Sequence, residues 1–289
     1  MEYPVNKSLS NAPATLYVVA SSIGNPQDLS PRALETLRTA DLVLAEDTRS
    51  ARKLLDGHGI DRRTQSCFDA NEPARAEQAA TLLRSGTSIA LLSEAGTPTV
   101  SDPGYRVVRA AIAAGARVVP VPGPSAVLAA LVGSGLPTDR FLFLGFPPRK
   151  AGARQELLEQ VRGLPVTLVF FESPHRVVAT LGDLATVLGK DRPACLCREL
   201  TKTHEEFVRG TLAELASKYE SERPLGEVTL LVGGASAQEQ GDGLSEEKLQ
   251  ARGRALLDSG LSVRDAADAL ASETGRPRRE TYRLVLDLR

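Results

Sequence analysis

The stretch Thr87–Ala126, TSIALLSEAGTPTVSDPGYRVVRAAIAAGARVVPVPGPSA, contains the pattern from which we predict the fold class. It opens with an apolar run at residues 87–92 and continues into a loop rich in Gly, Pro and Ser at 93–104. The spacing then predicts a helix near 105–114 and a second apolar strand, RVVPV, at 117–121. Continuous apolar strands separated by helices are typical of βαβ units in a mostly parallel sheet.

The same arrangement precedes this stretch. A short apolar strand, LYVVA, runs into the turn Ser21–Pro26, and a helix is predicted from Pro31 through about Thr39. Ser30 is a good helix cap, and proline is favoured at the first helical position. The next apolar strand, near 41–45, ends in the charged cluster EDTR. Polar and charged residues therefore follow the strands where the strands end.

The strand pattern pauses at GSGLP, residues 133–137, which predicts a boundary between an N-terminal α/β domain at 14–134 and a second α/β domain at 135–236. The second domain has the apolar runs FLFLGF, VTLVFF, ACLCREL and EVTLLVGG at closer spacing, so we expect a mixed sheet. Residues 1–13 are expected to be a disordered tail. Residues 237–243 have linker composition, and 244–289 is predicted as a small all-helical unit.

Composition limits the protein class. The chain has 289 residues, 42% hydrophobic and 25% charged, with a formal net charge of -1, which excludes a largely disordered chain and a polycationic binder. Its three cysteines have neither disulfide-framework nor zinc spacing, so we expect buried thiols and no metal. No stretch has the features of a signal peptide or a membrane span. These features predict a cytoplasmic protein.

Three turn-rich loops are candidates for a binding site: Ser21–Pro26, residues 93–104 and Pro122–Ala126. Because each follows a strand of the predicted parallel sheet, we expect all three at one sheet edge, lining one pocket. A Gly-x-Gly-x-x-Gly fingerprint is absent, so the usual dinucleotide fold is disfavoured. Each loop alone could equally be a tight connection or a rigid surface loop.

Two charged motifs of the second domain, FESPHR at 171–176 and RELTKTHEE at 198–206, also follow apolar strands. That position directs side chains toward an inter-domain cleft. Neither motif supplies a His/Cys metal set, and no nucleophile elbow for Ser-His-Asp chemistry is present.

Taken in chain order, the motifs resemble those of the tetrapyrrole-methylase superfamily, over about residues 16–234. The motifs are IGNPQDLSPRALETL, AEDTR, LLSEAGTPTVSDPGY, VPVPGPSA, GLPTDRFLFLGFPPRK, FFESPHR, CRELTKTHEE and GEVTLLVGG. Within the superfamily the chain is similar to enzymes that methylate the 2′-hydroxyl of a cytidine in the decoding region of 16S ribosomal RNA. It departs from their pattern at Ser21-Ser22, where Thr-Pro is usual, at Glu94, where Asp is usual, and at Ala70, where His is usual.

The resemblance implies two α/β domains with S-adenosyl-L-methionine in the cleft between them, a homodimer, and 16S ribosomal RNA, within the small ribosomal subunit, as partner. It also implies that the C-terminal helices bind RNA. The cofactor-binding residues that it implies are Ile23, Gly24, Glu94, Ala95, Gly96, Thr97, Pro98, Pro122, Gly123, Pro124, Ser125, Ala126, Phe146, Phe171, Glu172, Ser173 and Glu227.

The chemistry of ribose methylation selects further candidates. A 2′-hydroxyl is a poor nucleophile until its proton can leave, so a general base is needed. Glu199 and Lys202 are our candidates for that base, and Asp47, Arg49 and Asp102 for placing the nucleotide. A lysine base would have to be neutral. Alternatively, Glu199 and Lys202 form an ordinary ion pair.

Two other functions stay open: methylation of a small tetrapyrrole, and a non-enzymatic RNA-binding or assembly role. The ELTKTHEE motif and the helical unit argue against the first, and the three turn-rich loops argue against the second. Residues 245–289 carry nine Lys and Arg against eight Asp and Glu, so net charge does not predict RNA binding there. The clustered Arg276, Arg278 and Arg279 could nevertheless contact phosphates, or belong to a solvated, charge-balanced surface.

Overall fold

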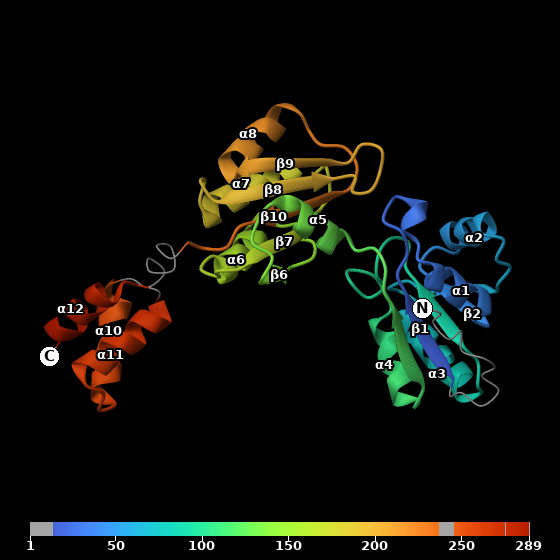
Figure 1. Ribbon diagram of the computed structural model, residues 1–289, viewed down its shortest axis with the longest axis horizontal. Coiled ribbons are helices and arrows are strands. Elements are labelled where there is room, and N and C mark those ends of the chain that lie inside the picture. The colour runs from blue at the N-terminus through green and yellow to red at the C-terminus, as the bar shows by residue number, and fades with distance from the viewer. Residues whose placement is uncertain (1–13, 237–245, 275, 289) are drawn as a thin grey trace, which may run out of the picture. The chain divides into compact units, whose positions relative to one another are not determined.

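A computed structural model of the chain describes residues 14–236, 246–274 and 276–288 (Figure 1). The described residues form two compact units. The first contains the residues through Ala129 together with Leu200–His204, and the second contains those of Ala130–Glu199 and Glu205–Arg289.

The sheet of the first unit is entirely parallel, as the sequence predicts, with the strand order β3-β2-β4-β1-β5. Its strands are β1 (Thr15–Val19), β2 (Leu42–Ala45), β3 (Thr64–Ser66), β4 (Ile89–Leu92) and β5 (Arg117–Val121). Its helices are η1 (Pro26–Asp28), α1 (Pro31–Thr39), α2 (Thr48–Gly57), α3 (Glu72–Arg84) and α4 (Tyr105–Ala113).

Helices cover both faces of this sheet. Val43 of β2 packs with Leu37 of α1 and Leu55 of α2, whereas its neighbour Leu42 packs with Leu83 of α3 and Val107 of α4. Successive strand residues point to opposite faces, so a strand buried on both sides is apolar throughout. The result is a three-layer α/β/α unit.

The second unit contains a mixed sheet, again as predicted, with the order β6-β7-β10-β8-β9. Its strands are β6 (Phe141–Phe143), β7 (Thr167–Glu172), β8 (Pro193–Arg198), β9 (Glu206–Thr211) and β10 (Val228–Val232). The pair β6–β7 is parallel, and the other pairs are antiparallel. The helices α6 (Ala151–Val161), α7 (Val177–Leu188) and α8 (Leu212–Ser221) share one apolar core with this sheet, and α5 (Ala126–Ser134) spans the division between the units.

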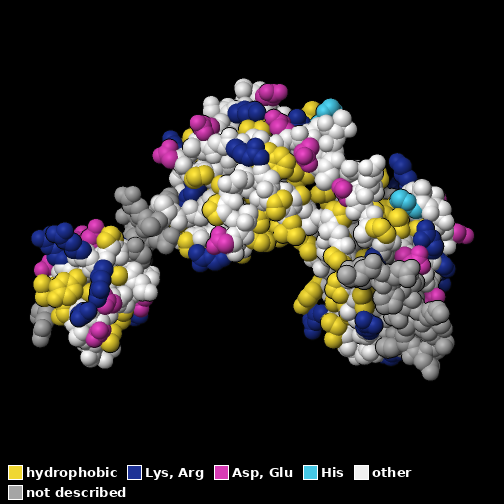
Figure 2. Space-filling model, viewed as in Figure 1, with side chains coloured by type: hydrophobic (Ala, Val, Ile, Leu, Met, Phe, Trp, Pro, Cys, Tyr) yellow, Lys and Arg dark blue, Asp and Glu magenta, His cyan; other side chains and the backbone are white. Residues whose placement is uncertain are grey.

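Three helices end the chain: α10 (Glu246–Asp258), α11 (Val263–Thr274) and α12 (Arg278–Asp287). They enclose a small apolar core of their own, with Leu249, Leu270 and Val285 fully buried. The predicted helical unit is thus present. On the face drawn in Figure 2, basic and acidic side chains are both exposed over these helices, in keeping with the balanced charge of the segment.

The predicted fold class, α/β with C-terminal helices, is confirmed. Cys67, Cys195 and Cys197 are free and buried, as expected. The predicted domain boundaries stay predictions, and the predicted tail (1–13) and linker (237–243) lie outside the described residues. No helix in the described part of the chain combines the length and apolarity needed to cross a membrane.

Candidate active site

The carboxyl ends of the parallel strands bring the three turn-rich loops of the first unit together. The N–H of Ser21 donates a hydrogen bond to the carbonyl of Gly96 (2.7 Å). The Thr97 hydroxyl donates to the carbonyl of Pro124 (3.4 Å), so the second loop contacts the third. The predicted gathering of these loops at one sheet edge is therefore confirmed, whereas the expectation that all three line one pocket stays a prediction.

Small residues allow these loops to pack closely. Gly96 has φ +73°, and a Cβ there would lie 3.3 Å from the Ile23 side chain. A Cβ at Gly123 would lie 3.0 Å from that of Ala20. Glycine lets a backbone approach a neighbour or a ligand this closely, and Pro122 and Gly123 stay exposed. The glycines thus let the loops pack on one another, and the exposed backbone at Pro122 and Gly123 is left where a ligand could contact its main-chain groups.

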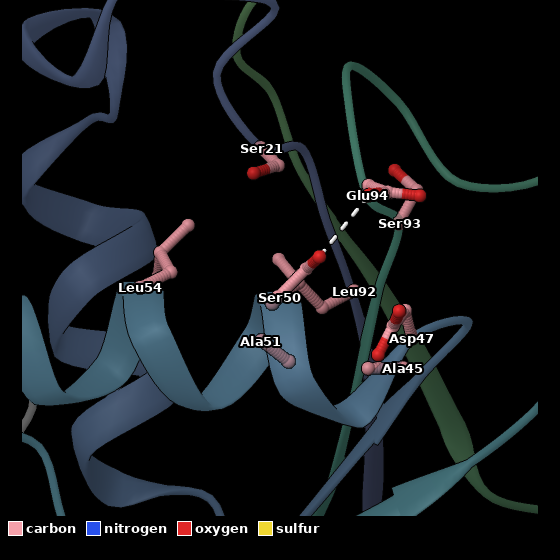
Figure 3. Close-up of a pocket in the computed structure, with 9 residues that line it drawn as sticks. All are labelled: Ser21, Ala45, Asp47, Ser50, Ala51, Leu54, Leu92, Ser93 and Glu94. Carbon is pink, nitrogen blue, oxygen red and sulfur yellow. Dashed lines mark hydrogen bonds between the residues drawn. The ribbon is translucent and has the colours of Figure 1, made fainter.

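Beside these loops lies a small pocket with a volume of about 20 Å³ (Figure 3). Ser50 on α2 donates to Glu94 Oε1 (3.1 Å) at its wall, and Ser21 faces α2 from the other side. Ser21 is 1% exposed, and its buried hydroxyl has no hydrogen-bond partner among the described residues. A buried hydroxyl without a partner costs about 1–3 kcal/mol, and a pocket of this size admits a water molecule or one polar ligand atom.

Carboxylates concentrate at the same edge. Burial, followed by the charge of Glu46, raises the pKa of Asp102 to about 6. Burial, followed by the charge of Glu94, likewise raises the pKa of Glu46. Asp47 differs, because hydrogen bonds from Arg49 lower its pKa. Two carboxyl groups here therefore hold protons more tightly than usual, a feature that clusters at functional sites.

A buried carboxylate fixes the far end of the loop that carries Asp102. The N–H groups of Gly104 and Arg106 donate to Glu72 Oε1 at 2.9 and 2.7 Å. Gly104 precedes α4 and has no side chain with which to cap it, so Glu72 of α3 caps α4 instead. Sequence reasoning did not assign this role to Glu72. An acidic residue in the first turn of a helix is ordinarily explained by the helix dipole.

The segment Leu200–His204 belongs to the first unit, although the chain around it belongs to the second. The N–H of Asn25 donates to the Thr201 hydroxyl (3.0 Å), and a Cβ at Gly24 would overlap the side chain of Lys202. Lys202 therefore lies against the first of the three loops. Thr201 has φ +65°, a strained value for a residue other than glycine.

The predicted site residues of the second unit lie at one edge of its own sheet. Glu172 pairs with Val228, which in turn pairs with Arg198, so the ends of β7 and β8 and the start of β10 share this edge. The site residues at this edge are Phe146, Phe171, Glu172, Ser173, Glu199 and Glu227.

These residues differ in what they expose. Phe146 is 56% exposed and packs against Phe171 with ring centroids 5.6 Å apart. Glu199 Oε1 accepts a hydrogen bond from the N–H of Glu227 (3.0 Å). The carboxylate of Glu172 is buried and accepts from the Thr180 hydroxyl (2.5 Å), so a ligand could reach this residue only through its backbone.

The three arginines predicted to bind RNA are not equivalent. Arg278 donates to Asp268 Oδ2 (2.6 Å) and joins α12 to α11. Arg276 is half-buried, whereas Arg279 is exposed. Arg278 and Arg279 are both exposed, and of these two only Arg278 is ion-paired among the described residues. No group of three or more His, Cys, Asp or Glu side chains is placed to hold a metal ion in the described residues.

Comparison with known proteins identifies the family. Residues 15–216 match the family described as Tetrapyrrole (Corrin/Porphyrin) Methylases. The chain belongs to this family. The predicted enzyme class, a methyltransferase, is confirmed with it.

This tetrapyrrole-methylase chain is similar over most of its length to proteins named as ribosomal RNA methyltransferases. It is 45% identical over 273 residues to the Ribosomal RNA small subunit methyltransferase I of Synechocystis sp., covering 94% of this chain and 98% of the relative. The protein of the same name from Mesorhizobium japonicum is 46% identical over 275 residues, with 95% and 92% covered.

The fold is also found in solved structures. Uroporphyrin-III C-methyl transferase from Thermus thermophilus, complexed with S-adenyl homocysteine, has a TM-score of 0.55 to this tetrapyrrole methylase. The match is 21% identical and covers 75% of this chain and 97% of that one. At that identity the likeness shows the fold alone.

Proposed function

We propose that this chain transfers a methyl group from S-adenosyl-L-methionine to the ribose 2′-hydroxyl of a cytidine in the decoding region of 16S ribosomal RNA. The observation that carries the proposal is its 45% identity, over 94% of its length, with a Ribosomal RNA small subunit methyltransferase I. A match of 273 residues is longer than residues 1–245, so it includes part of the C-terminal helical segment that begins at Glu246. We further propose that the enzyme acts as a homodimer on RNA within the small subunit.

The competing proposal is that the substrate is a small tetrapyrrole. The family is described as tetrapyrrole methylases, and the solved relative is named as a uroporphyrin methyl transferase. The solved relative covers only 75% of this chain, whereas the ribosomal RNA methyltransferases cover 94–95%. The longer match favours RNA.

The two substrates can be separated directly. Purified protein with methyl-labelled S-adenosylmethionine is offered either small ribosomal subunits or a reduced tetrapyrrole. We expect label in the RNA only; label in the tetrapyrrole alone would reject our proposal.

The proposed cofactor contacts are main-chain groups of the three gathered loops, with Phe146, Phe171, Glu172, Ser173 and Glu227 from the second unit. The first-unit residues are Ile23, Gly24, Glu94, Ala95, Gly96, Thr97, Pro98, Pro122, Gly123, Pro124, Ser125 and Ala126. When bound, S-adenosylmethionine supplies a methyl group on a positively charged sulfur, which is the electrophile of the reaction. The exposed backbone at Pro122 and Gly123 and the Ser21 hydroxyl, which has no partner among the described residues, support this assignment.

The chain's own residues supply positioning and proton transfer. The attacking hydroxyl must be held in line with the bond that breaks, and positioning of this kind gives much of the rate. We propose Glu199 or Lys202 as the acceptor of the hydroxyl proton, and Asp47, Arg49 and Asp102 as the residues that place the nucleotide. The contact of Lys202 with the loop at Gly24 supports a role for it beside the cofactor loops.

Substitution tests the choice of base. General-base catalysis contributes about 10²–10⁴-fold, so Glu199→Gln or Lys202→Ala should lower kcat by at least 10²-fold, with cofactor affinity retained. Glu205→Gln, a change of the same type at an exposed neighbour, is the control for Glu199→Gln. Near-wild-type kcat in both variants would remove the pair from catalysis.

A further inference from the structure

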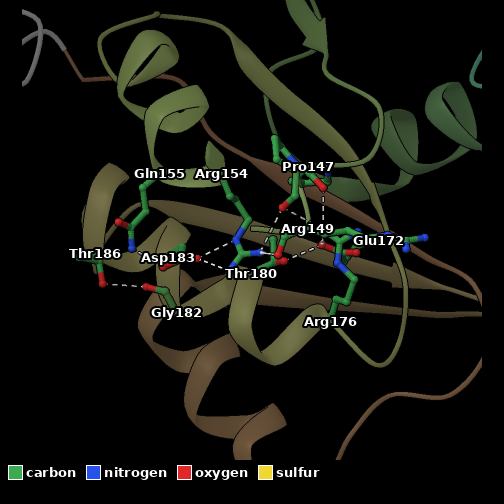
Figure 4. Close-up of polar contacts among 11 residues, drawn as sticks. Pro147, Arg149, Arg154, Gln155, Glu172, Arg176, Thr180, Gly182, Asp183 and Thr186 are labelled. Carbon is green, nitrogen blue, oxygen red and sulfur yellow. Dashed lines mark hydrogen bonds and ion pairs between the residues drawn. The ribbon is translucent and has the colours of Figure 1, made fainter. Parts of the chain in front are cut away.

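In the second unit, two arginines donate hydrogen bonds to backbone carbonyls of the loop Gly145–Lys150 (Figure 4). Arg154 of α6 donates to the carbonyls of Pro148 (3.3 Å) and Arg149 (3.4 Å). Arg176 donates to the carbonyls of Pro147 (2.5 Å) and Pro148 (3.3 Å). Three successive loop carbonyls thus point toward the protein interior.

Each arginine is itself anchored by a carboxylate. Arg154 is 4% exposed, and its Nε donates to Asp183 Oδ2 at 2.6 Å. Arg176 pairs with the buried Glu172 at 3.4 Å. Buried ion pairs rarely stabilise a fold more than apolar residues of the same size would. We therefore attribute to this network the fixing of one loop conformation, which the two prolines stiffen further.

With its carbonyls turned inward, the loop exposes basic side chains. Arg149 and Lys150 are both exposed, and neither forms an ion pair within the part of the chain that the structure describes. The nearby carboxylates of Asp183 and Glu172 are engaged by the anchoring arginines. Neither carboxylate is therefore free to pair with Arg149 or Lys150, and the side chains that the loop exposes carry positive charge.

The loop follows β6, and the Ser173–Arg176 segment follows β7; because the two strands are parallel, both segments leave the sheet at the same edge. Phe146, a proposed cofactor contact, lies three residues before Arg149. Three residues of chain span at most about 10 Å. An anion bound by Arg149 would consequently lie within a few nucleotide spacings of the proposed methyl-transfer site.

We propose that Arg149 and Lys150 bind backbone phosphates of the RNA strand beside the methylated nucleotide, on a loop that Arg154 and Arg176 hold rigid. The proposal rests on the ribosomal RNA substrate proposed above and adds a second RNA contact to that of the C-terminal helices. Lysine and arginine contacts to phosphate position a nucleic acid without reading its sequence. A rigid loop suits that task, because it fixes where the strand lies.

The test is the double variant Arg149→Ala/Lys150→Ala in the full chain. We expect the KM for small ribosomal subunits, or for a 16S RNA fragment, to rise about tenfold at 0.15 M salt, with the KM for S-adenosylmethionine unchanged. The slope of log K against log salt for RNA binding should become shallower by about 1–2, since each phosphate contact contributes about 0.7 on a single strand.

The matched control is Arg162→Ala/Lys190→Ala, which removes the same charges at the opposite edge of the same sheet. Arg162 and Lys190 are exposed and precede the starts of β7 and β8. Arg162 lies 3.8 Å from Glu159, but a pair this exposed contributes little to stability. An equal loss of RNA affinity in both double variants, or no loss in the loop variant, would overturn this inference. Neither result would contradict the proposed methylation of ribosomal RNA.

Two further outcomes also decide the matter. Loss of S-adenosylmethionine binding together with RNA binding would show that the loop supports the fold or the cofactor site and not the RNA. Wild-type protein that neither binds nor methylates ribosomal RNA would reject the proposed function, and this inference with it.

Discussion

Glu72 links two parts of the first unit that lie far apart in sequence. It is 7% exposed and accepts hydrogen bonds from the N–H groups of Gly104 and Arg106. Glu72→Ala leaves both donors without this acceptor, so we expect the free energy of unfolding to fall by about 2–3 kcal/mol. Glu72→Gln retains an acceptor oxygen and should lose less. Urea denaturation measures both.

The control for this prediction is Glu77→Ala, at an exposed position on the same helix. A surface change of this kind should stay within about 0.5 kcal/mol of wild type. An Ala variant at Glu72 as stable as that control would show that the capping of α4 contributes nothing measurable.

The raised pKa of Asp102 should make the free energy of unfolding depend on pH. Its pKa is 3.8 when unperturbed and about 6 in the folded chain, because burial and the charge of Glu46 favour the neutral form. Between these values the folded state holds a proton that the unfolded state has lost, so stability falls as pH rises. Asp102→Asn removes this loss and should be more stable than wild type at pH 7.5 by about 1 kcal/mol after solvent screening.

At pH 3.5 the difference between Asp102→Asn and wild type should largely vanish, because Asp102 is then mostly protonated in both states. Thermal unfolding at both pH values checks this. A constant difference would mean that Asp102 is not the group that titrates; Asp28→Asn, at an exposed position, is the control.

Among the C-terminal helices, α12 carries two adjacent arginines, of which one is ion-paired to α11 and the other is not. Both arginines are exposed, but Arg278 binds Asp268 of α11, whereas Arg279 has no ion pair among the described residues. Arg279→Ala should weaken RNA binding several-fold and leave thermal stability unchanged. Arg278→Ala should lower the melting temperature by loosening α11 from α12. If Arg278→Ala were instead the more harmful to RNA affinity at unchanged stability, the assignment would be reversed.

Sequence pattern predicted some elements and missed others for physical reasons. The helix at Pro31–Thr39 was predicted from its cap, and the Ser30 hydroxyl does accept from the N–H of Ala33. Strand β9 was not predicted, because EFVRGT lies at the edge of its sheet and lacks a continuous apolar run. Sequence pattern therefore sufficed for an element whose stabilising contacts lie within a few residues, such as a capped helix.

The contacts that shape the site are not local. Glu72 and Gly104 are 32 residues apart, and Arg154 and Asp183 are 29 apart. No periodicity or turn signal indicates which buried charge meets which. The gathering of the three loops could be predicted because parallel strands place their carboxyl ends at one edge. The approach of Lys202 to Gly24 could not, because it depends on the path of the chain between strands.

At the scale of the whole molecule, the proposed function is one reaction: methylation of a ribose hydroxyl in 16S ribosomal RNA. The most direct measurement treats purified small subunits, and in parallel their naked RNA, with the enzyme and methyl-labelled S-adenosylmethionine. The modified nucleotide is then mapped by its resistance to alkaline cleavage, which requires a free 2′-hydroxyl. We predict one resistant position, a cytidine in the decoding region, with more transfer to the subunit than to naked RNA. Transfer to a base, transfer to many positions, or no transfer by protein that binds the cofactor would contradict the account.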